Sequence, residues 1–122
     1  MPREKLVPGP DHPITVEPTG KRVTVSIGGR VVADTKDALT LQEAGYPAVQ
    51  YVPLVDVDPA VLRPSDHETY CPFKGEASYY SLSTDEGELA DVVWTYREPY
   101  EAVAEIKDHV AFYANRVDIS LG

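Results

Sequence analysis

The fold class of this chain is decided by the segment Val23-Thr24-Val25-Ser26-Ile27-Gly28-Gly29-Arg30-Val31-Val32-Ala33. Apolar β-branched residues alternate with Thr and Ser over residues 23–27, and a second β-prone run follows over residues 30–33. An alternation with a period of two is typical of a strand with one buried face. Because glycine readily adopts positive φ, Gly28-Gly29 can supply both central residues of a tight turn. The segment therefore predicts an antiparallel hairpin with a two-residue turn.

Further short strands are expected on both sides of this hairpin. The β-prone segments are residues 14–17, 38–42 (a strand or one loose turn), 49–52, 67–72, 76–83 and 89–96, with a closing hairpin expected from residues 110–113 and 117–120. Two brief segments have helical character. Asp58-Pro59 suits the start of a helical turn over residues 60–62, and residues 99–106 place apolar side chains at helical spacing. The pattern predicts a mainly β fold of compact, curled or barrel-like antiparallel sheets with one or two short helical segments.

The length of 122 residues predicts one domain, and a hydrophobic content of 43% is enough for one packed core. Residues 1–13 are polar and rich in proline, so we expect a flexible lead-in there, followed by a single β domain over residues 14–122. The lead-in lacks the apolar stretch of a signal peptide, and no run in the chain approaches the length of a membrane span. We therefore expect a soluble, cytoplasmic protein.

The charge balance and the cysteine count restrict the partners and sites of the protein. Its formal net charge of −9 argues against binding to duplex nucleic acid or to an anionic membrane, since both need clustered Lys and Arg. A single cysteine excludes an internal disulfide and a four-cysteine zinc site, and it fits a reducing compartment. We expect no nucleic-acid or membrane partner, and a monomer or a weak homodimer.

The stretch most suggestive of function is Tyr70-Cys71-Pro72-Phe73-Lys74-Gly75-Glu76-Ala77-Ser78-Tyr79-Tyr80. It combines the only cysteine and a lysine with three tyrosines, a proline and a glycine, a mixture that an ordinary strand does not need. Cys71 is either a buried apolar thiol or a thiolate nucleophile activated by a nearby cation. Lys74 is either a solvated turn residue or a residue that contacts a ligand. In the second case it could bind a carboxylate or a phosphate or, when desolvated, act as an amine nucleophile.

Aromatic residues gather around the same region. On the expected strands, Tyr80 and Tyr79 face opposite sides, while Trp94 and Tyr96 share a face. One side could therefore present Trp94, Tyr96 and one of the two tyrosines as a wall suited to a planar or cationic ligand. A β core that happens to contain aromatic residues is the commoner explanation of such a cluster.

Several phrases of the sequence resemble the bacterial family called "domain of unknown function 427". They are Gly28-Gly29-Arg30-Val31-Val32-Ala33-Asp34, residues 62–66, Tyr70-Cys71-Pro72-Phe73-Lys74-Gly75, Ala77-Ser78-Tyr79-Tyr80, Val93-Trp94-Thr95-Tyr96, Val110-Ala111-Phe112-Tyr113 and Arg116-Val117-Asp118. The resemblance spans roughly residues 14–120 and implies a compact β domain, related to the β-tent group, without a settled activity. The family is sometimes labelled nucleotidyltransferase-like. Many β-tent proteins bind zinc through paired Cys-x-x-Cys motifs, which this chain lacks.

Metal chemistry has weak support in the sequence. His67 and Cys71 share a strand face and could be joined by His109, but no short-spaced ligand pair supports such a site, and we predict no metal and no cofactor. Asp56 and Asp58 would suit metal-dependent nucleotidyl transfer, although Asp58 is better explained as a cap before a proline. His12 lies in the lead-in and is given no role.

We expect a domain that binds a small molecule in an aromatic-lined pocket. The expected pocket residues are Lys74, Tyr80, Trp94, Tyr96 and Arg116, with Lys74 holding an anionic or carbonyl group and Arg116 as a second cation at the rim. The first alternative is an enzyme that uses Cys71 or Lys74 on a small substrate, with Tyr80 or His67 moving protons. The second alternative is a protein-interaction module.

Overall fold

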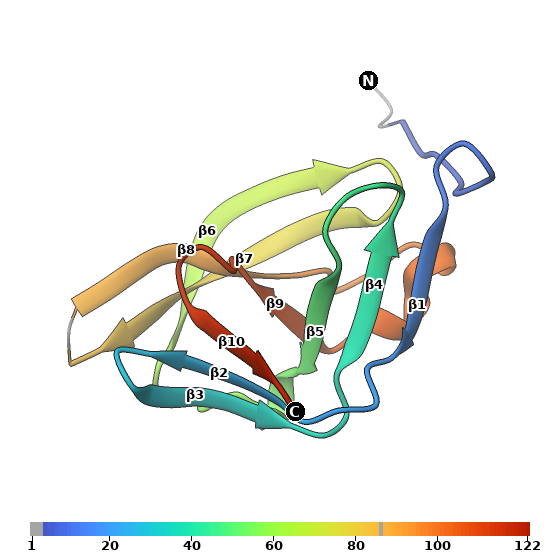
Figure 1. Ribbon diagram of the computed structural model, residues 1–122. Coiled ribbons are helices and arrows are strands. Elements are labelled where there is room, and N and C mark those ends of the chain that lie inside the picture. The colour runs from blue at the N-terminus through green and yellow to red at the C-terminus, as the bar shows by residue number, and fades with distance from the viewer. Residues whose placement is uncertain (1–3, 86) are drawn as a thin grey trace.

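A computed structural model describes residues 4–85 and 87–122, so residues 1–3 of the expected lead-in lie outside the described residues. In this part of the chain, ten strands form two antiparallel sheets (Figure 1). The large sheet has the order β1-β4-β5-β9-β8-β7-β6, and the small sheet has the order β10-β2-β3. The large-sheet strands are β1 (Ile14–Pro18), β4 (Leu39–Glu43), β5 (Val49–Pro53), β6 (Leu62–Cys71), β7 (Gly75–Thr84), β8 (Gly87–Thr95) and β9 (His109–Phe112); the small-sheet strands are β2 (Val23–Ile27), β3 (Arg30–Thr35) and β10 (Asp118–Leu121).

The predicted hairpin is confirmed as β2 and β3, which pair from Val23↔Thr35 to Ile27↔Arg30. Both turn glycines adopt positive φ, 55° at Gly28 and 84° at Gly29, as the tight turn requires. The mainly β class with curled antiparallel sheets is confirmed as well. The described strands leave both sheets open, with β1 and β6 at the edges of the larger one, so they do not close a barrel.

The expected closing hairpin near the C-terminus is wrong. Strand β9 lies inside the large sheet between β5 and β8, whereas β10 pairs with β2 in the small sheet (Figure 1). Local sequence shows that both segments prefer an extended backbone, but the choice of neighbour depends on packing across the whole domain. The two segments therefore link the sheets instead of pairing with each other.

The two helical predictions had different outcomes. Residues 99–106 contain the 3₁₀ segment η2 (Glu101–Ile106), which is broken at Val103, where ψ is 28°. The turn expected over residues 60–62 is a single hydrogen-bonded turn at residues 59–61 and not a helix: the Val61 amide donates to the Asp58 carbonyl at 3.3 Å, and the Ala60 amide donates to the Asp58 side chain at 2.9 Å. A second 3₁₀ turn, η1 (Leu54–Asp56), comes earlier instead. Among the described residues, no helix is long and apolar enough to cross a membrane.

The large sheet buries apolar side chains on both of its faces. One face packs against the small sheet, where side chains such as Val25, Val52 and Leu82 form the first core cluster. The opposite face packs against η2 and forms the second cluster, which includes Tyr51, Tyr79 and Tyr96. Because successive residues of a strand point to opposite faces, adjacent tyrosines of β7 belong to different clusters, Tyr79 to the second and Tyr80 to the first. This second, aromatic cluster supports the candidate site.

Candidate functional site

A cavity of about 240 Å³ opens on the face of the large sheet that carries the second core cluster. Its aromatic wall consists of Tyr46, Tyr51, Tyr79, Trp94, Tyr96 and Tyr113. Leu41, Pro47 and Val49 add aliphatic surface, and Glu43 and Lys74 supply its charged groups. The cavity therefore combines an apolar, aromatic interior with one charged end, which is the usual composition of a small-molecule site.

The structure brings three of the predicted pocket residues together, Lys74, Trp94 and Tyr96. Tyr80 packs against the other core cluster, on the opposite face of the sheet. Tyr79 takes the place in the cavity that was expected for Tyr80, because Tyr79 pairs with Trp94 across β7 and β8. Arg116 lies apart from the cavity, in a turn beside Gly28 at the far end of β2. Alternation had indicated that one of the two tyrosines would join Trp94, but only the packing showed which.

Cys71 does not line the cavity. It is half-buried and packs against the second core cluster, which contains Tyr51 and Tyr96. The thiol is therefore close to the aromatic wall but is not one of the groups that line the cavity. Cys71 is thus packed like a small apolar core residue, which is common for free cysteines.

Lys74 is held in the cavity by the tight turn between β6 and β7. The Lys74 amide donates to the Cys71 carbonyl at 3.2 Å, and the Tyr100 amide donates to the Lys74 carbonyl at 2.9 Å. Gly75 follows with a φ of 110°, and a Cβ atom there would lie 3.4 Å from the Glu98 carbonyl oxygen. The positive φ therefore favours glycine at this position, while residues 98–100 lie in van der Waals contact with the turn. The backbone geometry turns the Lys74 side chain inward, so that only 10% of it is exposed.

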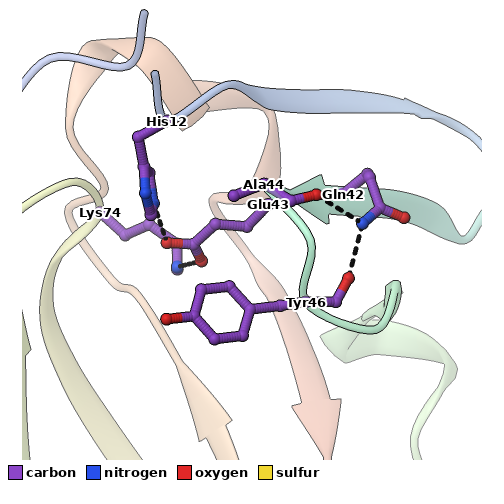
Figure 2. A network of polar contacts seen from close by, with 6 residues as sticks. All are labelled: His12, Gln42, Glu43, Ala44, Tyr46 and Lys74. Atoms are coloured by element: carbon purple, nitrogen blue, oxygen red, sulfur yellow. Dashed lines mark hydrogen bonds and ion pairs between the residues drawn. The ribbon is translucent and has the colours of Figure 1, made fainter. Parts of the chain in front are cut away.

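A three-residue polar network occupies the charged end of the cavity (Figure 2). The Lys74 ammonium donates to Oε1 of Glu43, and Nε2 of His12 donates to Oε2 of Glu43 at 2.7 Å. Burial alone would raise the pKa of Glu43. The hydrogen bonds from Lys74 and His12, together with the charge of Lys74 and that of His12 when it is protonated, outweigh that effect and hold the pKa below its ordinary value. Glu43 is therefore a carboxylate at neutral pH, with both oxygens engaged.

His12 was given no role in the sequence analysis, and the structure places it in this network. Its ring stacks on Phe73, with ring centroids 4.1 Å apart and planes at 8°. The surrounding segment also contacts the β6–β7 turn, since the Leu6 amide donates to the Pro72 carbonyl at 2.9 Å. The pairing of Ile14 with Glu43 in β1 and β4 brings His12 alongside the charged end. No local sequence signal marks this contact, because it joins residues 31 positions apart.

The turn after Glu43 is fixed by further hydrogen bonds. The Gln42 side-chain amide donates to the carbonyls of Ala44, at 3.3 Å, and of Tyr46, at 2.6 Å (Figure 2). The Ala44 amide donates to the Pro13 carbonyl at 2.8 Å. These contacts hold Tyr46 at the rim of the cavity, where its ring stays largely exposed.

Three tyrosine hydroxyls of the cavity, those of Tyr51, Tyr96 and Tyr113, stay protonated at physiological pH. Burial raises the pKa of Tyr51 and of Tyr96 far above the ordinary value of 10. At the rim, burial and the neighbouring Tyr79 hydroxyl raise the pKa of Tyr113 to about 12. The Tyr51 hydroxyl accepts from the Trp94 indole nitrogen at 3.2 Å, while the Tyr96 hydroxyl makes no hydrogen bond to any described residue. The aromatic wall is thus also a source of hydrogen-bond donors.

The described residues contain no group of three His, Cys, Asp or Glu side chains arranged to hold a metal ion. The ring of His67 lies against Tyr79, with centroids 4.5 Å apart, and Nδ1 of His109 lies 2.7 Å from the Lys107 carbonyl oxygen. The acidic pair considered for nucleotidyl transfer is engaged elsewhere: Asp56 accepts from Thr35 at 2.7 Å, and Asp58 accepts from Arg30 at 3.2 Å.

Comparisons with known proteins agree with the resemblance seen in the sequence. A search of curated proteins found no match. A family model named NTP_transf_9, described as a domain of unknown function (DUF427), matches residues 15–121, which is nearly the whole chain. The chain therefore belongs to the DUF427 family.

Proposed function

We propose that the protein binds a small planar molecule in the cavity, with an acceptor group of the ligand directed at Lys74 and Tyr96. The observation that carries the proposal is that Lys74, Trp94 and Tyr96 open onto one cavity, although Lys74 comes from a different part of the sequence than the other two. A cluster of aromatic residues that served only the core would fill its own space. Here the aromatic side chains surround a hollow instead.

The size of the hollow suits a single aromatic ring with a short substituent. A cavity of about 150 Å³ is large enough to bind benzene, and this cavity measures about 240 Å³. The rings of Trp94 and Tyr113 lie 4.7 Å apart and tilted at 49°, and Tyr51 meets Trp94 edge to face. Such a wall offers both ring faces and ring edges to an aromatic ligand, and both contacts are favourable.

The polar groups of the cavity favour a ligand that accepts hydrogen bonds. An ammonium group carries three donors, and Glu43 is the only described residue that accepts from Lys74. Tyr96 adds a hydroxyl that has no partner among the described residues, although Tyr96 itself is only 7% exposed. Both oxygens of Glu43, by contrast, are already engaged. A carbonyl or carboxyl oxygen on the ligand would satisfy these spare donors.

The single tryptophan makes the proposal testable by NMR. Because Trp94 is the only tryptophan in the chain, its indole N–H gives one resolved signal that reports on the cavity. Benzamide, a neutral aromatic ring with a carbonyl acceptor, should shift this signal saturably, and the variant Tyr96→Phe should weaken the binding several-fold. Arg116→Ala should leave it unchanged. If Arg116→Ala weakened binding as much as Tyr96→Phe, the ligand would lie outside the cavity.

An enzyme that uses Lys74 as a proton donor is the second candidate. The chain of contacts from His12 through Glu43 to Lys74 supports it, because such a chain can supply and recover a proton at the cavity. A nucleophilic Cys71 has less support, since Cys71 packs against the second core cluster and does not line the cavity. Iodoacetamide should label Cys71 more slowly than free cysteine at neutral pH. Labelling much faster than that would favour thiol chemistry over simple binding.

A further inference from the structure

The charges at the end of the cavity balance only as long as no anion binds. Lys74 carries one positive charge and Glu43 one negative charge, and only 10% and 18% of their side chains are exposed. His12 faces Glu43 from the N-terminal segment, with Phe73 stacked on its ring. The Tyr46 ring is tilted at 59° to the His12 ring, with ring centroids 6.5 Å apart. Among the described residues, Lys74 and His12 are the only cationic or potentially cationic side chains that contact Glu43.

The donors that remain unused point to an oxygen ligand. Two N–H groups of the Lys74 ammonium and the hydroxyl of Tyr96 have no partner among the described residues. Both residues are more than nine-tenths buried, and both line the same cavity. A carboxylate has two oxygens and can accept from two such donors at once, and hydrogen bonds to a charged acceptor are stronger than those to a neutral amide.

We propose that the preferred ligand of this cavity is an aromatic carboxylate, whose oxygens accept from Lys74 and Tyr96, and that His12 takes up a proton when it binds. This inference rests on the proposed function, because it assigns a ligand class to the same cavity. The ring occupies the aromatic wall around Trp94, and the carboxylate lies beside the Lys74 ammonium.

The coupling to His12 follows from charge balance. An added carboxylate leaves two negative charges beside one ammonium in a largely buried site, and a buried charge without a partner is strongly disfavoured. Histidine is the side chain that ordinarily gains its proton between about pH 5 and pH 8. A protonated His12 keeps its hydrogen bond to Glu43 and restores a net charge of zero. The affinity for the anion must therefore rise as the pH falls, since bound ligand and bound proton favour each other.

The experiment compares benzoate with benzamide, two rings of nearly equal shape that differ in charge. Affinities are measured on the Trp94 indole signal and by calorimetry between about pH 6 and pH 8.5. Benzoate should bind more tightly than benzamide near pH 6, and its affinity should fall by up to about tenfold per pH unit as the pH rises across this range. The affinity for benzamide should stay constant. Calorimetry in two buffers with different ionisation heats should show uptake of up to about one proton per benzoate.

Two histidine variants separate the coupled proton from a general effect of pH. His12→Asn removes the titrating ring but keeps a side-chain donor near Glu43. It should abolish both the pH dependence and the proton uptake, while leaving the affinity for benzamide unchanged. His109→Asn is the matched control, because His109 is hydrogen-bonded to Lys107 outside the cavity, and it should behave as the unaltered protein does. Thermal unfolding of each variant confirms that it is folded.

The outcomes distinguish the inference from the function on which it rests. If benzamide binds and benzoate binds no more tightly near pH 6, or binds without proton uptake, the carboxylate inference is wrong and the binding function stands. Retention of the full pH dependence in His12→Asn would also overturn the assignment. If neither probe shifts the Trp94 signal at millimolar concentration, both the inference and the binding of small aromatic ligands are refuted.

Discussion

Breaking the contact between Lys74 and Glu43 should destabilise the protein more than breaking an ion pair on its surface. Lys74→Met keeps an unbranched apolar side chain of similar length and removes the ammonium group. Removal of one partner from a buried ion pair typically costs about 3–5 kcal/mol. Glu43 is 18% exposed and keeps its hydrogen bond from His12, so we expect a smaller loss, about 2 kcal/mol in the free energy of unfolding.

Urea unfolding at neutral pH, followed by circular dichroism, measures this loss. The double variant Lys74→Met/Glu43→Gln removes both charges, so it should be more stable than the sum of the single losses predicts, by about 1–2 kcal/mol. The matched control is Asp34→Asn, which breaks the pair with Arg22, whose side chains are 40% and 55% exposed. Exposed pairs contribute little because water screens them. The reasoning is refuted if Lys74→Met costs no more than Asp34→Asn, or if the two cavity substitutions are additive.

Three further predictions concern pH and the backbone. In an alkaline titration followed by phenolate absorbance, Tyr51 and Tyr96 should ionise last and only as the protein unfolds. Because burial raises their pKa values in the folded state, the stability they contribute is complete below about pH 10 and is lost as the pH rises beyond it. Tyr51→Phe or Tyr96→Phe should each remove one late-ionising group. Glu43 behaves in the opposite sense: its lowered pKa contributes stability that is complete above its ordinary value of 4.5 and is lost as the pH falls through the lower folded-state pKa, so Glu43→Gln should flatten this part of the acid unfolding curve. Gly75→Ala should lower the free energy of unfolding, measured by thermal unfolding, by about 1–2 kcal/mol, since alanine disfavours positive φ. Gly45→Ala is the control and should change this free energy little, because a Cβ atom at Gly45 would meet nothing within 4 Å. Equal losses in the two variants would contradict this account.

Local patterns in the sequence predicted those parts of the fold whose information is itself local. The hairpin of β2 and β3 was predicted because its alternation and its Gly28-Gly29 turn lie within eleven consecutive residues. The strands on either side of the cavity were expected for the same reason. The last two strands were correctly expected to be extended, but their pairing was wrong. The sequence of an extended segment does not specify which strand it pairs with, and in the structure β9 pairs with β5 and β8.

The candidate site was predicted in the same uneven way. The phrase around Lys74 indicated a bend with a functional lysine, and alternation indicated that Tyr79 and Tyr80 would face opposite sides. Neither observation could say which tyrosine meets Trp94, because that depends on the register of β7 against β8. His12 carried no signal at all. It joins the network only because the pairing of β1 with β4 brings the N-terminal segment beside Glu43.

The sequence by itself determined that this is a mainly β domain and that Lys74 sits at a tight bend, since both depend on the conformational preferences of neighbouring residues. The tertiary structure alone decided that Lys74 turns inward, that Glu43 and His12 meet it there, and that Tyr79 and not Tyr80 completes the aromatic wall. The physical reason is distance along the chain. Glu43 and Lys74 are 31 residues apart, as are His12 and Glu43, and only the burial of a shared core brings such residues into contact.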